Sequence, residues 1–167
     1  NQKCPAPACR PARVVWKHFG GENTFPSGWD EMMEEVDKGD SAQYTKDEVL
    51  YPKAWGLLNF IMDARTGLGR FREFRISNYE LMMDLIEHCR DKSIAEIMEL
   101  PDVKERVDVY FSHREKFQEQ LRRCASVCGN LVILDLRHED PIWAGNRFEI
   151  YAVFPQCNIS VHVLWGL

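Results

Sequence analysis

The sequence has neither a long apolar run nor an excess of positive charge. No stretch of 18 consecutive apolar residues occurs, so the sequence predicts no membrane-spanning helix. No charged-then-apolar leader precedes a cleavage pattern, which favours the cytoplasm. The formal net charge is −5, from 21 Lys and Arg against 26 Asp and Glu. Duplex nucleic acid is therefore not an expected partner, and any polyanion must bind at a local basic site.

The cysteines lack the spacing of a zinc site. A structural zinc ion needs four ligands, usually supplied as two closely spaced pairs. Cys4 and Cys9 lack a second pair that would complete the four ligands. Cys124 and Cys128 lie at helical spacing near the end of a predicted helix. Because the six cysteines are dispersed over 167 residues, we expect reduced thiols rather than a disulfide framework.

What is present is the composition of an ordinary globular chain, with 45% hydrophobic and 28% charged residues. Prolines at positions 5, 7 and 11 exclude a helix from the first part of the chain. Helical periodicity then predominates as far as Gly129. It predicts helices over 12–19, from 29 to an end at Gly39, over 47–62, 77–89 and 93–98, and a helix of about six turns that starts at Asp102.

Beyond Gly129 the periodicity becomes that of strands. An apolar run at 131–136, an alternating segment at 147–154 and a third segment at 158–164 predict three successive strands. Such a series suggests an antiparallel or mixed sheet. The predicted fold class is therefore α/β, mostly helical, with its strands toward the C-terminus.

Asp37 and Asp40 are the candidate metal ligands. They lie at the C-terminal end of the helix predicted from 29, where the partial negative charge of the helix end favours a nearby cation. Carboxylate oxygens suit hard ions such as Mn²⁺ and Mg²⁺. In the alternative interpretation, Asp40 caps the following turn with Ser41 and Asp37 is solvated.

The segment at 63–72 is the candidate anion-binding loop, because it combines two glycines with three arginines. The glycines free the backbone to approach a ligand. The arginines are Arg65, Arg70 and Arg72, and each guanidinium can hold phosphate oxygens through two parallel hydrogen bonds. Alternatively, these arginines pair with neighbouring acids such as Glu73.

Several segments together resemble the DHH family of phosphoesterases, in its bacterial exopolyphosphatase-related branch. The segment 40–44 is similar to the Asp-Thr-Gly-x-Phe turn that supplies a metal-binding aspartate in that family. The other similar segments are 60–72, 76–79, 145–152 and 157–163, so that the resemblance extends over nearly the whole chain. The Asp-His-His triplet, the Asp-x-Asp pair and the glycine-rich Gly-Gly-Gly-His segment of the family are not found in these 167 residues. We therefore interpret the chain as a middle segment of a longer enzyme.

The resemblance implies a full-length phosphoesterase with two Mn or Mg ions, which hydrolyses phosphodiester or phosphoanhydride bonds. Its substrates would be short oligonucleotides, cyclic dinucleotides or polyphosphate. Residues 1–100 would be the mostly helical C-terminal part of the DHH-type metal domain, 101–127 a connector helix and 128–167 the start of the DHH-associated C-terminal α/β domain. Arg147 would contact substrate from that last domain, with a plain surface arginine as the alternative. His162 is interpreted as a structural strand residue.

A binding module is the second functional hypothesis. An acidic, helical segment with one arginine loop could recognise a phosphorylated ligand without catalysing a reaction. In either case we expect the 167 residues alone to be inactive, because one aspartate-bearing turn cannot hold two metal ions. The sequence gives no indication of oligomeric state.

Overall fold

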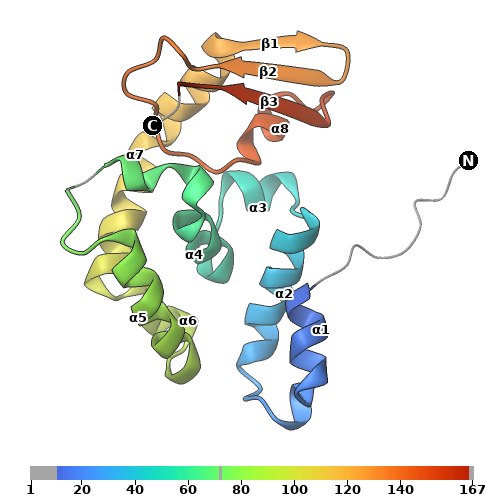
Figure 1. Ribbon diagram of the computed structural model, residues 1–167, viewed down its shortest axis with the longest axis vertical. Coiled ribbons are helices and arrows are strands. Elements are labelled where there is room, and N and C mark those ends of the chain that lie inside the picture. The colour runs from blue at the N-terminus through green and yellow to red at the C-terminus, as the bar shows by residue number, and fades with distance from the viewer. Residues whose placement is uncertain (1–10, 72, 166–167) are drawn as a thin grey trace, which may run out of the picture. The chain divides into compact units, whose positions relative to one another are not determined.

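The computed structural model describes residues 11–71 and 73–165, and these divide into two compact units (Figure 1). The first unit extends to Thr45 and the second begins at Lys46. No helix in the described ranges is long and apolar enough to cross a membrane. The predicted fold class is confirmed, because the chain is mostly helical and carries a small mixed sheet near its C-terminus.

The first unit is a pair of helices. Its elements are α1 (Pro11–His18), the short 3-10 helix η1 (Gly21–Asn23) and α2 (Trp29–Ser41). The chain leaves α1 through Gly20, whose φ of 104° is a conformation that favours glycine. Trp16 is buried against the ring of Phe25, and that ring stacks on Trp29 with 5.1 Å between centroids. The helix predicted at 12–19 is confirmed, together with its glycine end.

Helix α2 continues past its predicted end at Gly39. It runs to Ser41, and the following Ala42 adopts a left-handed conformation with φ 54° and donates its N–H to the carbonyl of Lys38. A glycine inside a helix costs only about 1 kcal/mol relative to alanine, which tertiary packing readily outweighs. Asp37 and Asp40 are consequently helical residues in the last turns of α2, and the predicted turn begins later than expected.

The helical part of the second unit contains five α-helices among the described residues. They are α3 (Lys46–Leu50), α4 (Ala54–Met62), α5 (Asn78–Asp91), α6 (Ile94–Met98) and α7 (Pro101–Cys124), with the 3-10 helices η2 (Ala64–Thr66) and η3 (Leu68–Arg70) after α4. Helices α5 and α6 each begin with a capping box, in which Ser77 pairs with Glu80 and Ser93 with Glu96. Their predicted starts are confirmed.

The single helix predicted over 47–62 was wrong, because the structure has two helices there. Pro52 lies between α3 and α4. Proline lacks the backbone N–H that a helix interior requires, and it disfavours the helical conformation of the residue before it, here Tyr51. The apolar face that suggested one continuous helix is thus shared by two short helices.

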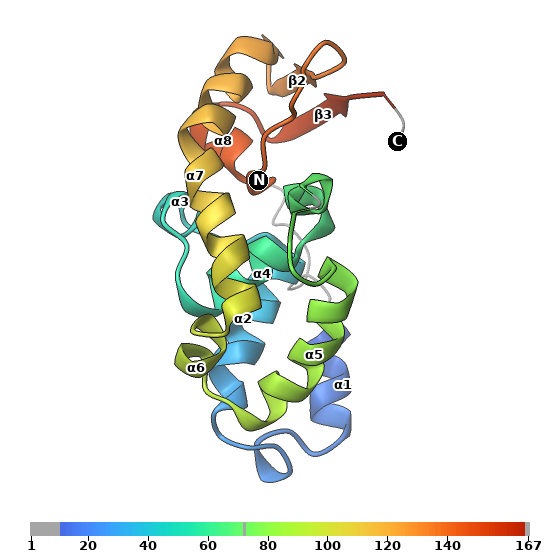
Figure 2. The ribbon, with the colours of Figure 1, turned by 90° about the vertical axis from the view of Figure 1, so that its left-hand side faces the viewer.

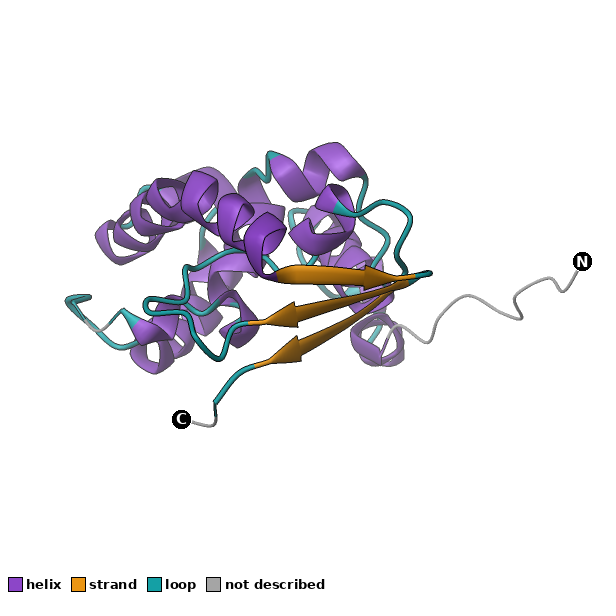
Figure 3. Cartoon of the chain, turned by 90° about the horizontal axis from the view of Figure 1, so that it is seen from above, coloured by secondary structure: helices purple, strands orange, loops and turns teal. Residues whose placement is uncertain are grey.

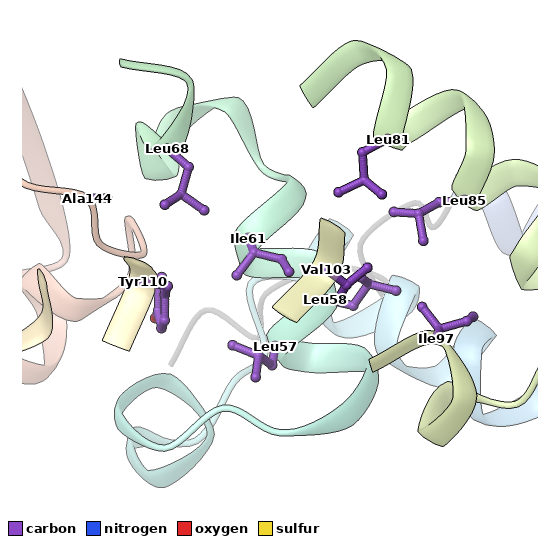
Figure 4. Packing of buried hydrophobic residues seen from close by; sticks show 10 residues of the cluster. All are labelled: Leu57, Leu58, Ile61, Leu68, Leu81, Leu85, Ile97, Val103, Tyr110 and Ala144. Atoms are coloured by element: carbon purple, nitrogen blue, oxygen red, sulfur yellow. The ribbon is translucent and has the colours of Figure 1, made fainter. Parts of the chain in front are cut away.

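Helix α7 spans the second unit lengthwise, from α6 at one end to the sheet at the other (Figure 2). Its first half contributes Val103 and Tyr110 to a helical core, and its second half contributes Phe117 and Leu121 to a core under the sheet. Figure 4 shows the helical core, in which side chains from α4, α5, α6 and α7 converge. The long predicted helix is confirmed, and within this unit it joins the two cores.

The buried Arg106 fixes the segment before α5 against α7. Its guanidinium donates to the Asn78 side chain at 2.7 Å and to the backbone carbonyls of Ile76 at 2.6 Å and Asp102 at 2.8 Å. The guanidinium also lies over the ring of Phe74, 4.3 Å from its centroid. These bonds satisfy a charge that would otherwise be costly to bury.

The sheet is small and mixed (Figure 3). Its strands are β1 (Ala125–Cys128), β2 (Leu131–Asp135) and β3 (Ile159–Val163), in the order β1-β2-β3. β1 pairs antiparallel with β2, whereas β3 pairs parallel with β2, so that Leu134 lies beside His162. Strand β1 was not predicted, although the two residues Gly129 and Asn130 between strands are a recognised hairpin signal.

The strand predicted over 147–154 was wrong, because this segment forms helix α8 (Glu149–Val153). Short apolar segments fit both helical and strand periodicity. Here the side-chain oxygen of Asn146 accepts a hydrogen bond from the backbone N–H of Phe148 at 2.8 Å, which turns the chain into the helix. Ile150 then packs into the core under the sheet.

Candidate functional site

A pocket of about 260 Å³ lies in the second unit, lined by the loop after α4, helix α7, the sheet and the segment leading into α8. Its walls combine guanidinium groups, aromatic rings and small polar groups. The basic members are Arg65, Arg70 and Arg147, the aromatic members are Phe117, Trp143, Phe148 and Tyr151, and the remaining polar members are Thr66, Ser160 and His162. Three of the four arginines predicted to bind substrate therefore share one pocket. Arg72, the fourth, lies outside the described residues.

Hydrogen bonds at Thr66 connect the two loops of the pocket and anchor the first loop to α4. The N–H of Gly145 donates to the carbonyl of Thr66 at 3.1 Å, and the Thr66 hydroxyl donates to the carbonyl of Phe60 at 2.5 Å. Gly145 packs so closely on Phe117 that a β-carbon at this position would overlap the ring. A close approach of this kind requires glycine.

Arg147 follows the buried Asn146, which is 1% exposed. The Asn146 amide donates to the carbonyl of Val49 at 2.9 Å, while its oxygen accepts from the N–H of Phe148. The Arg147 guanidinium lies over the Phe148 ring, 4.1 Å from the centroid. The hydrogen bonds of Asn146 fix the backbone next to Arg147, whose side chain lines the pocket and is 33% exposed.

Asp63 joins two of the arginines that line the pocket. Its carboxylate accepts hydrogen bonds from Nε and Nη2 of Arg65, each at 2.8 Å, and lies 3.3 Å from Nε of Arg147. Burial alone would raise the pKa of Asp63, but the hydrogen bonds from Arg65 and the charges of Arg65 and Arg147 lower it below its usual value. The alternative in which the arginines pair with a neighbouring acid thus applies to Arg65, with Asp63 as the acid.

Arg70 has no such partner, since no described residue forms a hydrogen bond or an ion pair with its guanidinium. The chain reverses at Gly67, where φ is 83°, and a β-carbon at Gly67 would overlap the guanidinium of Arg70. Partial burial lowers the pKa of Arg70, although a guanidinium stays protonated at any physiological pH. Arg70 therefore presents an uncompensated positive charge to the pocket.

The sheet contributes a polar strip from β3. Ser160 and His162 point to the same face because residues two apart in a strand do so. The Ser160 hydroxyl and the Tyr151 hydroxyl lie 2.9 Å apart. Partial burial lowers the pKa of His162, so its imidazole is neutral at pH 7. Its place in the pocket was missed, although the alternation around it predicts which face it shares with Ser160.

This combination of groups suits a nucleotide. Guanidinium groups hold phosphate oxygens in pairs, and aromatic rings supply flat faces on which bases stack. The aromatic members were not identified from the sequence, because Trp143 lies in an irregular segment without periodicity and Phe117 belongs to a helix face that also predicts simple core packing.

The predicted metal ligands lie in the first unit. Asp37 is buried and its Oδ2 accepts from Nε of Arg13 at 2.9 Å, so it is not solvated, and as a ligand it would have to exchange this partner. Asp40 is exposed and its carboxylate has the oxygen donors that Mn²⁺ or Mg²⁺ prefers. Two carboxylates are fewer ligands than such an ion needs, and the described ranges contain no group of three or more His, Cys, Asp or Glu able to hold a metal. The metal site stays a prediction that requires ligands from outside these ranges.

No protein-family model matches the chain, and neither does any curated protein. A solved structure described as the pGpG-specific phosphodiesterase PggH from Vibrio cholerae is similar to it, with a TM-score of 0.82 and 64% sequence identity. The match covers 93% of this chain and 52% of that chain. The chain thus spans about half the length of the structure it resembles. Its fold is that of one part of a larger phosphodiesterase structure.

Proposed function

We propose that this chain is the substrate-binding segment of a phosphodiesterase that hydrolyses short oligonucleotides such as pGpG. The observation that carries the proposal is the convergence of Arg65, Arg70 and Arg147 on one pocket with aromatic walls. The similarity to a pGpG-specific phosphodiesterase supports the same substrate class. Among the substrates implied by the DHH resemblance, polyphosphate has no base that could stack on the aromatic rings of the pocket. A nucleotide therefore fits this pocket better.

The reaction would need metal ligands from the rest of the full-length protein, in the manner of the DHH family. Two bound Mn or Mg ions would supply a nucleophilic hydroxide and neutralise charge on the phosphoryl oxygens. The residues of this chain would hold the substrate. Arg70 would bind a phosphate through paired hydrogen bonds, Arg147 and Arg65 would add charge, and the rings of Trp143 and Phe148 would contact a base.

The substitution Arg70→Lys in the full-length protein tests this role. Lysine keeps the charge but loses the paired hydrogen bonds. We expect the KM for pGpG to rise about tenfold, because one hydrogen bond to a charged group contributes about 1.5–3 kcal/mol, while kcat changes little. Steady-state kinetics of pGpG hydrolysis with Mn²⁺ measure both constants.

Arg90→Lys is the matched control for that experiment. Arg90 is exposed and pairs with its neighbour Asp91 on α5, and it does not line the pocket. Its replacement should leave both constants unchanged. A lower melting temperature of Arg70→Lys with an unchanged KM would show a structural role for Arg70 and would reject the proposal.

The binding-module hypothesis predicts a different result for the wild type. A module would bind pGpG but release it intact, whatever divalent ion is added. Hydrolysis of pGpG by the wild-type full-length protein, abolished by chelation and restored by Mn²⁺, separates the enzyme from the module.

A further inference from the structure

Side chains on one face of α7 hold the second loop of the pocket, residues 141–148. The buried Gln120 accepts a hydrogen bond from the backbone N–H of Trp143 at 3.0 Å. Two turns earlier on the helix, Nδ1 of His113 accepts from the backbone N–H of Ala144 at 3.4 Å. Because residues seven apart share a helix face, α7 fixes the backbone of this loop at two points.

The ring of His113 also contacts the first loop of the pocket, residues 63–71. It is 9% exposed and packs edge-on against two other rings, with 4.4 Å between centroids to Phe71 and 4.9 Å to Trp143. Phe71 directly follows Arg70, the proposed phosphate contact, and Trp143 is the proposed base contact. His113 therefore lies between the two parts of the pocket that would hold a nucleotide.

His113 is neutral at pH 7. Burial and the positive charge of Lys116 lower its pKa below the usual value. The charged groups of the two loops are Asp63, Arg65, Arg70 and Arg147, and those next to His113 on α7 are Arg114, Glu115 and Lys116. Asp63, the one acid of these loops, is paired with Arg65. Since Nδ1 accepts a hydrogen bond, a second proton on the ring would place a donor against the N–H of Ala144.

We infer that His113 is a positioning residue for substrate binding, which fixes Trp143 in the second loop relative to Arg70 in the first. The inference rests on the proposed function, since it names the residue that sets the base contact and the phosphate contact relative to each other. Only the neutral ring can accept from Ala144. A nucleotide that touches both loops therefore binds less tightly once His113 is protonated.

Two substitutions of similar size in the full-length protein separate this role from simple core packing. In His113→Asn the amide oxygen lies as far along the side chain as Nδ1 and can still accept from Ala144, whereas His113→Leu only fills the space. Calorimetric titration of pGpG at pH 8, with metal chelated, compares them. We expect His113→Asn to bind pGpG about fivefold more tightly, the effect of one ordinary hydrogen bond. Core packing alone predicts the reverse order, because leucine is the better buried residue.

The pH dependence of binding supplies a second readout. As His113 is protonated between pH 8 and pH 5, the Kd of the wild type divided by that of His113→Asn should rise toward about fivefold. His162 and the phosphate of pGpG also titrate, but they do so in both proteins and cancel in this ratio. Imidazole NMR signals give the pH at which His113 is protonated. His138→Asn, an exposed position outside the pocket, should follow the wild type.

Two results would overturn the positioning role of His113. One is an affinity of His113→Leu equal to or above that of His113→Asn, and the other is a constant ratio of Kd values while His113 is protonated. If the wild type binds pGpG in either case, the proposed function stands and the inference alone fails. If the wild type does not bind pGpG at any pH, the proposed function fails and the positioning role fails with it.

Discussion

Arg70 and Arg65 lie five residues apart in one loop, yet the fold gives them different surroundings. Arg65 is held by Asp63 through its side chain and its backbone N–H. The Arg70 guanidinium lies over Gly67, and no described residue forms a hydrogen bond or an ion pair with it. The arginine that we propose to bind the substrate phosphate is thus distinguished by the absence of a partner among the described residues, a feature that local sequence does not reveal.

Gly67→Ala is predicted to disturb substrate binding indirectly. An alanine would be strained at φ 83° and its β-carbon would displace the Arg70 guanidinium. We expect a stability loss of about 1–2 kcal/mol from the backbone conformation, together with a rise in the KM for pGpG similar to that of Arg70→Lys. Thermal melting and steady-state kinetics measure the two effects.

Gly69→Ala is the matched control for that substitution. A β-carbon at Gly69 would meet only the Asn78 amide at 3.6 Å, an ordinary contact, and its φ lies outside the left-handed region. It should therefore leave the KM unchanged. If Gly67→Ala also kept the wild-type KM, the position of Arg70 over Gly67 would have no bearing on substrate.

At the residue scale, the charged members of the pocket are predictable from the sequence and its aromatic members are not. Arg65, Arg70 and Arg147 are all candidates from the sequence alone. Trp143 and Tyr151 are not candidates from the sequence, because an aromatic residue predicts core packing wherever it occurs. Only tertiary contacts show whether its ring packs in the core or lines a pocket. The role of Asn146 could not be predicted either, since its partner Val49 is distant in sequence.

At the scale of elements, α8 shows why periodicity alone fails for short segments. Five residues of helix cannot be distinguished from five residues of strand by their apolar pattern. The deciding contacts are tertiary: Glu149, at the start of α8, accepts hydrogen bonds from Gln118 at 3.1 Å and Tyr110 at 3.4 Å, both on α7. The long helices were predictable because many turns repeat one pattern, and α5 and α6 also carry capping boxes.

Glu149→Gln is predicted to change how stability depends on pH. Burial raises the pKa of Glu149 above its usual value, and hydrogen bonds from Gln118, Tyr110 and the Asn146 backbone only partly oppose this. The folded state therefore binds this proton more tightly than the unfolded state does. The contribution of protonated Glu149 to the free energy of unfolding is fully present below the unfolded pKa, near 4.5. It is lost as the pH rises through the folded pKa.

Urea unfolding of wild type and variant between pH 4 and pH 8 measures this effect. The wild type should lose stability over the upper part of the range relative to Glu149→Gln, because glutamine has no proton to lose and keeps an acceptor for Gln118. Glu119→Gln, an exposed glutamate on α7, should follow the wild type. Parallel pH profiles of stability for the wild type and Glu149→Gln would show that folding does not raise the pKa of Glu149.

At the scale of the whole molecule, the predicted chemistry is divided between the two units. The candidate metal ligands belong to the unit that ends at Thr45, and the arginine pocket belongs to the unit that begins at Lys46. The fold class was predictable from the change of periodicity near Gly129. The division into domains at 100 and 127 stays a prediction about the full-length protein, because the described residues separate elsewhere and the chain matches only 52% of the similar structure.

Asp40→Asn and Asp37→Asn should have different effects in the full-length protein. Asp40 is exposed, so its substitution should leave the melting temperature unchanged and, if it is a metal ligand, raise the Mn²⁺ concentration needed for activity. Asp37 pairs with Arg13, so its substitution should cost about 1–3 kcal/mol of stability. Thermal melting and Mn²⁺ activation curves separate the two. An unchanged activation curve for Asp40→Asn would remove this residue from the metal site.

The pocket as a phosphate-binding site is tested most directly by calorimetric titration of pGpG into the full-length protein with metal chelated. Under these conditions binding is measured without hydrolysis, and the wild type is compared with Arg70→Gln and Arg90→Gln. We predict an affinity at least about tenfold weaker for Arg70→Gln, from the loss of one charge-assisted contact, and no change for Arg90→Gln. Wild-type affinity in a folded Arg70→Gln protein would contradict the assignment of this pocket to the substrate phosphate.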